Sequence, residues 1–469
     1  MSTQALPTTE WQTRRMMPTT MAVGVALGIA YTLSPLATLG AVATIFLGRA
    51  LVRDLEGAER QVMLAIFVVA VVLRLALVAG LFLSIDHSST PFGSLFGDEE
   101  YFKRRSLWLR SMALGVNVSE ADRTYALDEY SETSYLYLLA FVQMIVGDAP
   151  YGIHVVSMCA YLAGAVWLFR FSRRVYGPAP AAIAFTGVLF MPTLFFWSVS
   201  ALRESVHFLL TFAAIAGASD ALTRERWRAR IVGGGVAGAA ILLLRDLREG
   251  SMVALLLSLL VGTAAAMAVR SWRHLAVAVV AVAVAGGFLL SRPATQERAM
   301  SALRTTALMH QGHAFTPGIH YKLLEPKFYR DRVLNIMDDL TPQQAGRYVL
   351  RSLVAALVVP WPWQAETLML KAYLPEHVVW LVLATLLPVG VWAGARRHPE
   401  ATFIVTAYVA VMFAGIALRS GNVGTLVRHR GLVLPFVICL GAVAICHVLW
   451  RLASTTSAQQ GPITDGPHR

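Results

Sequence analysis

Residues 61–84, QVMLAIFVVAVVLRLALVAGLFLS, decide the fold class of this chain, because Arg74 is the one charged residue among them. An α-helix needs about 20 mainly apolar residues to cross the hydrocarbon core of a bilayer. The rest of the sequence has the same character: 56% of its 469 residues are hydrophobic, 14% are charged, and the mean hydropathy is +0.58. A soluble domain carries about 25% charged residues. The sequence therefore predicts an all-α polytopic membrane protein.

Further apolar runs follow along the chain, and each is close to the length that a membrane span requires. They are 151–169, 178–199, 205–222, 231–244, 250–269, 274–290, 377–395, 401–418 and 431–450. Residues 18–33 and 36–48 are separated by Ser34 and Pro35, and they predict a short hairpin that crosses the bilayer or only dips into it. We expect a bundle of about 10–12 transmembrane helices in total.

Arginine-rich short loops predict the orientation, because Lys and Arg next to spans stay in the cytoplasm. Five such loops lie around Arg53, Arg173, Arg226, Arg273 and Arg397. If all five are cytoplasmic, both termini are cytoplasmic, and the long segments 85–150 and 292–375 lie on the outer face. The apolar stretch 133–147 is then too short to cross, so we expect a helix in the outer leaflet. The net charge of +12 fits loops that meet anionic lipid better than a nucleic-acid surface.

The composition along the chain predicts five parts. They are a cytoplasmic lead with the hairpin (1–60), a transmembrane core with an outer loop (61–291, loop 85–150), an outer loop with juxtamembrane helices (292–376), C-terminal spans (377–452) and a disordered polar tail (453–469). Cys159, Cys439 and Cys446 lie in apolar runs, which is typical of buried core residues and not of disulfides or metal ligands.

Four polar groups come together on the outer face in this topology. Acids beside membrane spans are costly to place and therefore indicate function, and arginine suits phosphate because its planar fork donates two parallel hydrogen bonds. The sequence predicts a site for a phosphate headgroup with a lipid tail. The groups are Asp98-Glu99-Glu100-Tyr101, Arg203-Glu204, Arg245-Asp246-Leu247-Arg248-Glu249, and the segment 421–430 with Asn422, Arg428 and Arg430.

Simpler interpretations stay open for most of these residues. Glu99 and Glu100 are well placed to cap a helix that starts near Asp98. The turn 245–249 could satisfy its own charges, and Glu204 could pair with an arginine. The arginines of 428–430 could anchor the protein at the membrane interface. Arg74 lies within a span, where pairing inside the bundle is favoured over catalysis.

The order of these features resembles the N-terminal half of the GT-C glycosyltransferases, over about residues 61–222. That class includes protein mannosyltransferases, aminoarabinose transferase and oligosaccharyltransferase. The resemblance rests on a span, an acid that opens an outer loop, an apolar stretch closed by Gly147, a span that ends in Arg-Arg-Val-Tyr-Gly (173–177), and Pro192 to Ser200 leading into Arg203-Glu204. The segment 422–430 also resembles membrane proteins encoded in polysaccharide gene clusters.

The resemblance implies an enzyme that transfers a sugar or glycan from a polyprenyl phosphate or diphosphate to a glycan, lipid or protein acceptor. It implies that Asp98 is catalytic and that Glu204 takes the second acid position, where the family usually has Asp. The remaining residues of the four groups would bind substrate: Glu99, Tyr101, Arg203, Arg245, Arg248, Asn422, Arg428 and Arg430.

The expected setting is the periplasmic face of a bacterial inner membrane, in the assembly of a cell-surface polysaccharide or glycolipid. No cofactor is evident and no metal-ligand spacing stands out, although a divalent cation is left open; nucleic acid is not an expected partner. The alternative is a flippase or transporter of lipid-linked sugars, which would also need arginines that face phosphate. A transporter of that kind should show pseudo-symmetric halves and broken helices near the midplane, and the sequence indicates neither.

Overall fold

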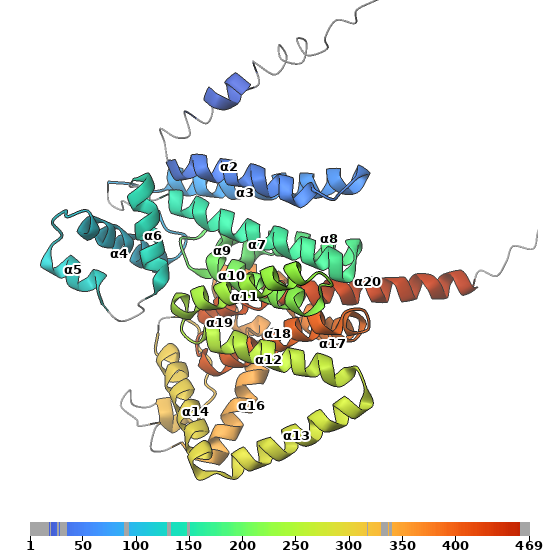
Figure 1. Ribbon diagram of the computed structural model, residues 1–469. Helices are drawn as coiled ribbons and strands as arrows, with labels where there is room; N and C mark the ends of the chain where they lie inside the picture. Colours follow the sequence, from blue (N-terminus) through green and yellow to red (C-terminus); the bar gives the residue numbers. More distant parts are fainter. Residues whose placement is uncertain are drawn as a thin grey trace, which may run out of the picture. The chain divides into compact units, whose positions relative to one another are not determined.

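The computed structural model describes residues 35–88, 93–128, 133–147, 151–316, 318–329 and 340–459, together with 18, 20–25, 28 and 336. The elements in the described ranges are helices (Figure 1), and the extended pairing found among them is a single bridge between His320 and Asn422. The predicted all-α fold is therefore confirmed.

Eight described helices are long and apolar enough to cross a membrane, and they confirm most of the runs read from the sequence. A further apolar run, 274–290, forms helix α13 (Trp272–Ser291), and 36–48 lies in α2 (Pro35–Val52). Half of 18–33 lies outside the described residues. The eight helices are α3 (Gly57–Ser84), α7 (Gly152–Tyr176), α10 (Glu204–Thr223), α11 (Trp227–Leu247), α12 (Ser251–Val269), α17 (Leu368–Ala395), α18 (Pro399–Arg419) and α20 (Leu434–Gln459).

The run 178–199 is not the single straight span that we expected. It forms two helices, α8 (Pro178–Phe190) and α9 (Pro192–Val199), that meet at an angle of 62°. Pro192 causes the break, because it has no N–H to donate to the preceding turn and its ring clashes there, while it fits the first position of a new helix. If the pair counts as one span, the described residues hold up to nine membrane-length helices. The expected number of 10–12 transmembrane helices also counted α13 and the predicted hairpin of 18–33 and 36–48.

The long segments between the spans carry short helices, as predicted. Segment 85–150 holds α4 (Gly97–Ala113), α5 (Glu120–Ala126) and α6 (Ser134–Val146). At 1.5 Å per residue, α6 is about 20 Å long and too short for the roughly 30 Å core of a bilayer. Its position in the outer leaflet stays a prediction.

In the C-terminal part, further helices come before the last three spans and between the final two. Segment 292–375 holds α14 (Pro293–Ala314), η1 (Pro326–Tyr329), α16 (Pro342–Val358) and η2 (Pro362–Gln364), and α19 (Val423–Arg430) precedes the last long helix. Helix α20 runs to Gln459, into the segment expected to be a tail, and 460–469 lies outside the described residues.

The chain forms two compact units, one from Met1–Ala163 and Trp197–Val206, the other from Gly164–Phe196 and His207–Arg469. In the first unit α4 packs against α5 and α6, and α2 packs against α3. In the second, α12 packs against α18, and α20 packs against α8 and α17.

The arginine-rich loops meet at one end of the second unit, which supports the assignment of these loops to one side of a membrane. The opposite ends of the same helices are joined separately, for example by His207 Nε2 and Ser251 Oγ at 3.0 Å. The contacts between the basic loops are Arg174 with Asp220, Arg270 with Glu400, and Arg397 with the Tyr176 carbonyl at 3.3 Å.

A cysteine at position 226 should be labelled only from the cytoplasm, and one at position 249 only from outside. Both positions are exposed, and they lie at opposite ends of α11. The measurement is labelling of Arg226→Cys and Glu249→Cys by a membrane-impermeant maleimide, in a variant without the three native cysteines. Labelling of both positions from the same side would contradict this topology.

Candidate functional site

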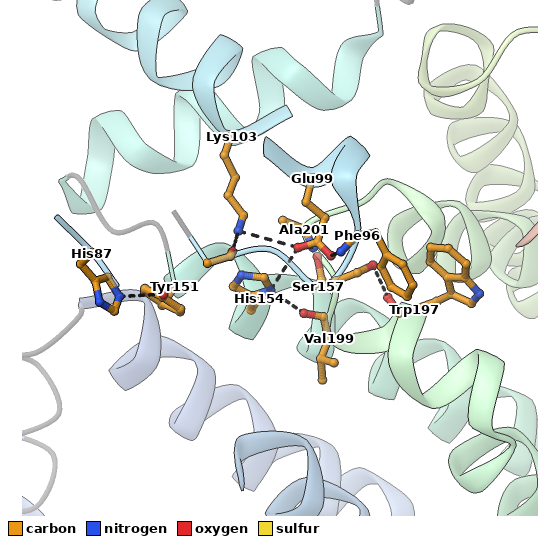
Figure 2. Close-up of polar contacts among 12 residues, drawn as sticks. His87, Phe96, Glu99, Lys103, Tyr151, His154, Ser157, Trp197, Val199 and Ala201 are labelled. Atoms are coloured by element: carbon orange, nitrogen blue, oxygen red, sulfur yellow. Dashed lines mark hydrogen bonds and ion pairs between the residues drawn. The ribbon is translucent and has the colours of Figure 1, made fainter. Parts of the chain in front are cut away.

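The first turn of α4 is anchored by the buried side chain of Glu99. Its Oε1 accepts a hydrogen bond from the Phe96 N–H at 3.1 Å, and its Oε2 accepts one from the Ala201 N–H at 3.2 Å (Figure 2). The first contact is the reach-back bond of a helix N-terminus, so the expected capping role of Glu99 is confirmed. The second contact joins α4 to the chain just before α10.

Two basic side chains complete this cluster, and both are buried. Lys103, one turn along α4, places Nζ 3.7 Å from Glu99 Oε2 and donates to the Gly93 carbonyl. His154 of α7 places Nδ1 2.6 Å from the Val199 carbonyl oxygen and 3.8 Å from Glu99 Oε2. Burial raises the pKa of Glu99 although Lys103 opposes the shift, and burial lowers the pKa of Lys103 to about 8. Glu99 thus joins α4, α7 and the segment before α10.

Asp98, the neighbour of Glu99, is exposed at the same helix start. The N-terminus of a helix carries a partial positive charge that favours a carboxylate there. Glu100 is half-buried and pairs with the exposed Arg104 on the next turn. The three acids therefore differ: Glu99 fixes the helix, Glu100 pairs along it, and Asp98 is exposed.

Glu204 and the acidic turn lie around one buried tyrosine in the same unit. Tyr135 of α6 is 1% exposed, and its hydroxyl oxygen is 3.5 Å from Ser157 Oγ. Burial raises the pKa of Tyr135, and the negative charges of Glu204 and Glu99 raise it further. Glu204 is the first residue of α10 and is 8% exposed. The structure thus brings together the two acidic segments that are far apart in the sequence.

An aromatic pair lies beside this turn. The Phe96 and Trp197 rings are stacked with centroids 4.2 Å apart and an angle of 18° between their planes (Figure 2). Phe96 immediately precedes α4, and Trp197 belongs to the segment that also carries Val199 and Ala201. The stack reinforces the connection that Glu99 makes.

Arg74 pairs inside the bundle, as expected. It is fully buried in α3, where Nε donates to Ser198 Oγ at 2.7 Å and an Nη donates to the Ala70 carbonyl at 3.0 Å. Its guanidinium also lies over the Tyr161 ring, 5.5 Å from the centroid. These contacts give Arg74 a structural role.

Tyr101 is involved in packing between α4 and α5. The Arg105 guanidinium lies 4.7 Å from the Tyr101 ring centroid and donates to the Tyr101 hydroxyl. Arg105 also donates to the carbonyls of Ala126 at 3.0 Å and Asp128 at 2.6 Å. Tyr101 is half-buried, so a role in substrate binding is secondary to this packing.

Arg203 and Glu204 belong to the first unit, as Glu99 and Tyr101 do, and the second unit holds Arg245, Arg248, Asn422, Arg428 and Arg430. Arg245 is 68% exposed and lies 3.7 Å from Asp246, so this turn partly satisfies its own charges. Arg248 is the half-buried residue that ends α11, and Arg428 is half-buried on α19. Asn422 is 6% exposed and caps α19, because its Oδ1 accepts from the Gly424 N–H at 2.8 Å.

Arg430 is buried and holds the C-terminal end of α16. Its Nε donates to the Ala356 carbonyl at 2.9 Å, and an Nη donates to the carbonyls of Ala356 and Val359. The last carbonyls of a helix have no partner within the helix, and a cation near them is favoured by the helix dipole. At 2% exposure, Arg430 is fastened to backbone and not presented to a phosphate.

Two side chains of α17 take the remaining carbonyls at this helix end. Trp380 Nε1 donates to the Leu357 carbonyl at 2.9 Å, and His377 Nε2 lies 3.0 Å from the Val358 carbonyl oxygen. The Ala355 carbonyl accepts from the Val359 N–H at 2.9 Å. Every carbonyl from 355 to 359 is therefore paired, and α16 is fixed to both α17 and α19.

The sequence analysis did not identify several buried polar residues, including Lys103, His154 and Glu376. Lys103 follows Glu99 at the four-residue spacing of a helical ion pair, which could have indicated it. His154 and Glu376 lie at the edges of apolar runs, where a polar residue is unusual. Glu376 is 6% exposed, and its Oε2 accepts from the Thr193 N–H at 2.8 Å, in the first turn after the break between α8 and α9. Across the described ranges, no group of three or more His, Cys, Asp or Glu side chains could hold a metal ion.

No protein-family model and no curated protein sequence matches this chain. A similar solved structure is the crystal structure of ArnT from Cupriavidus metallidurans bound to undecaprenyl phosphate. The sequences are 15% identical, the alignment covers 85% of this chain and 81% of that one, and the TM-score is 0.34. A similarity of this size assigns neither a family nor an activity to this chain.

Replacing Glu99 by Gln should destabilise the protein by about 3–5 kcal/mol, because it leaves the buried Lys103 without its carboxylate and turns an amide donor toward an N–H. Adding Lys103→Met should recover part of the loss. The measurement is denaturant unfolding in mixed micelles. Glu100→Gln is the matched control and should change stability by less than about 1 kcal/mol, because its partner Arg104 is exposed. Additive effects of the two buried substitutions would contradict the pairing.

Replacing Arg430 by Lys should lower the stability by about 1–3 kcal/mol for each carbonyl left unpaired, because an ammonium cannot reproduce the guanidinium fork. The exposed Arg245→Lys is the control and should stay within about 0.5 kcal/mol. Thermal unfolding in detergent measures both. An Arg430→Lys protein as stable as the control would show that these carbonyls are satisfied in another way.

Proposed function

We propose that this protein is an integral-membrane glycosyltransferase that uses a polyprenyl-phosphate or polyprenyl-diphosphate donor, with Asp98 as the acting carboxylate. The observation that carries the proposal is that two neighbouring acids at the start of α4 differ in burial and in contacts. Glu99 is buried and locks the turn to Ala201, while Asp98 on the same turn is exposed. Such a fixed, accessible acid is what a general base requires.

The reaction would be attack of an acceptor hydroxyl or amide on the anomeric carbon of the donor sugar. Asp98 would accept the acceptor's proton as the new glycosidic bond forms. The bond between the anomeric carbon and the phosphate oxygen breaks, and the phosphate leaves with its negative charge. A cation near that phosphate would stabilise the transition state.

Glu204 is proposed to act with Asp98 as a second acid, because it opens α10 and the nearby Ala201 N–H donates to Glu99, the neighbour of Asp98. Phosphate contacts are proposed for Arg203 within the first unit and, separately, for Arg245, Arg248 and Arg428 within the second; all four are at least partly accessible. Arg430, Asn422 and Tyr101 are left in supporting roles, because their polar groups are engaged in holding α16, α19 and α5.

The proposed setting is a bacterial inner membrane, with both termini in the cytoplasm and the site on the outer face. It is supported by the arginine-rich loops that meet at one end of the second unit. The partners would be the lipid-linked donor, membrane lipid and a glycan, lipid or protein acceptor of a cell-envelope polymer. A divalent cation would come with the donor phosphate, and activity with and without a chelator tests that point.

A flippase of lipid-linked sugars is the second candidate, and the break at Pro192 favours it to a degree. Broken helices occur at the substrate sites of many transporters, and Glu376 accepts from the first turn after this break. A flippase transfers no proton from the sugar acceptor, so the two candidates differ in what Asp98 does.

Replacing Asp98 by Asn should lower glycosyl transfer by about 10²–10⁴-fold, because the basic oxygen is lost while size is kept. Folding should not change, since Asp98 is exposed. The measurement is transfer of labelled sugar from the host's polyprenyl-linked pool in membranes that carry each variant. Glu120→Gln, an exposed acid at the start of α5, is the matched control and should keep full activity.

A purified protein that moves lipid-linked sugar across liposomes but never changes the mass of a glycan would establish the flippase instead. So would an Asp98→Asn protein with undiminished transport. Loss of activity in Glu120→Gln equal to that in Asp98→Asn would remove Asp98 from the proposal.

A further inference from the structure

Helix α16 buries one side and exposes an apolar stripe on another. The buried side consists of Ala345, Tyr348, Ser352 and Ala356. Leu350, Val354 and Leu357 are 66%, 53% and 37% exposed and follow each other at the four- and three-residue spacing of one helix face. An exposed apolar stripe of this kind requires an apolar environment.

The C-terminal end of α16 is held at membrane depth. Its carbonyls bind Trp380 and His377 of α17, and the candidate span of α17 begins at Leu370. With a rise of 1.5 Å per residue, these two side chains lie about 10–15 Å into that span. Leu357, whose carbonyl binds Trp380, lies at the level of this candidate span, so its exposed side chain can face lipid.

Two exposed arginines lie next to the stripe, on the part of α16 that is nearer its N-terminus. Arg347 and Arg351 are one turn apart, and Arg351 is about 9 Å from the level of Leu357 along the axis. Arg347 and Arg351 alternate with Leu350 and Val354 along the helix, so their guanidinium groups lie beside the apolar stripe. Their long side chains can extend toward lipid phosphates while the stripe meets acyl chains. The arrangement joins a phosphate-binding pair to a lipid-facing surface.

Both arginines line a small pocket with an apolar floor. Gln344 and Glu325 complete its rim, and the floor is formed by Leu323, Leu324, Phe328 and Leu340. These four side chains are at most 6% exposed. The pocket has room for about one water-sized group, so the arginines at its rim are the part that an anionic group can reach.

The segment that supplies the floor is fixed by Tyr329. Its hydroxyl oxygen accepts from the N–H groups of Leu323 and Leu324 at 3.0 and 3.1 Å, so its own proton goes to His310 Nε2 at 2.8 Å. Arg351 adds a contact to the Leu323 carbonyl at 3.4 Å. The pocket is therefore preformed, which reduces the entropic cost of binding.

The charges around the pocket favour an anion. Arg347 and Arg351 are joined by the exposed Lys322 and Lys327 of the floor segment. The acid that lines the pocket is Glu325, and its Oε2 accepts a hydrogen bond from Gln344 Nε2 at 2.9 Å. Arginine pairs bind phosphate through parallel hydrogen bonds.

We propose that Arg347 and Arg351 bind the phosphate of an anionic phospholipid from the leaflet in which α16 lies, with an acyl chain along Leu350, Val354 and Leu357. The site is independent of the proposed glycosyl transfer. A bilayer lipid is favoured over a soluble anion because the stripe continues directly from the arginine pair. Bound lipid would hold α16 at its depth in the membrane.

The test is native mass spectrometry of the delipidated protein titrated with phosphatidylglycerol or with phosphatidylcholine of the same chains. Wild-type protein should retain phosphatidylglycerol preferentially. The double variant R347Q/R351Q should bind it about 10–30-fold more weakly, because each arginine near an anionic lipid surface contributes about 1 kcal/mol. R292Q/R298Q, which removes two exposed charges at the start of α14, is the matched control and should bind like the wild type.

Equal loss in both double variants, or equal retention of the two lipids, would overturn the proposal, because binding would then follow net charge or chain length alone. Inorganic phosphate that displaces phosphatidylglycerol completely would indicate a soluble-anion site and would also overturn it. Polyprenyl phosphate that binds at Arg347 and Arg351 more tightly than phosphatidylglycerol would assign the pair to the donor instead. Circular dichroism and gel filtration confirm that each variant is folded.

Discussion

The buried carboxylate of Glu99 is the interaction on which the arrangement of the first unit depends. It accepts two backbone N–H groups, from Phe96 in its own helix turn and from Ala201 just before α10, with Lys103 beside it. A buried carboxylate is tolerated only when it is paired and hydrogen-bonded, so the three segments are held in one geometry. This geometry leaves Asp98 exposed on the turn that Glu99 fixes.

Other buried charged side chains of the protein also bind backbone groups. Arg430 takes carbonyls at the end of α16, Glu376 takes an N–H after the break at Pro192, and Arg74 binds a hydroxyl and a carbonyl within its bundle. In an apolar setting an unpaired backbone N–H or C=O group costs several kcal/mol. A buried side chain that hydrogen-bonds to that group removes this cost. Glu99, Arg430 and Glu376 therefore fasten backbone groups.

The sequence predicted the helices well, because the length of an apolar run alone determines whether it can cross a bilayer. It predicted which segments carry the candidate site, because charge near a span is rare. It could not separate Asp98 from Glu99, or Arg428 from Arg430. Neighbouring residues on a helix point about 100° apart, and which of them is buried depends on segments elsewhere in the chain. Pro192 could have predicted the break, because proline disrupts the interior of a helix. The continuous apolar character of 178–199 favoured a single span instead.

The central claim is that Asp98 faces the reacting atoms because Glu99 holds the turn behind it. The most direct measurement is an electron cryomicroscopy structure of the full chain with a polyprenyl-phosphate sugar bound. The account predicts the Asp98 carboxylate within about 3–5 Å of the space that an acceptor needs at the anomeric carbon, with Glu99 still bound to Ala201. A sugar bound more than about 15 Å from Asp98, with no solvated path between them, would contradict it.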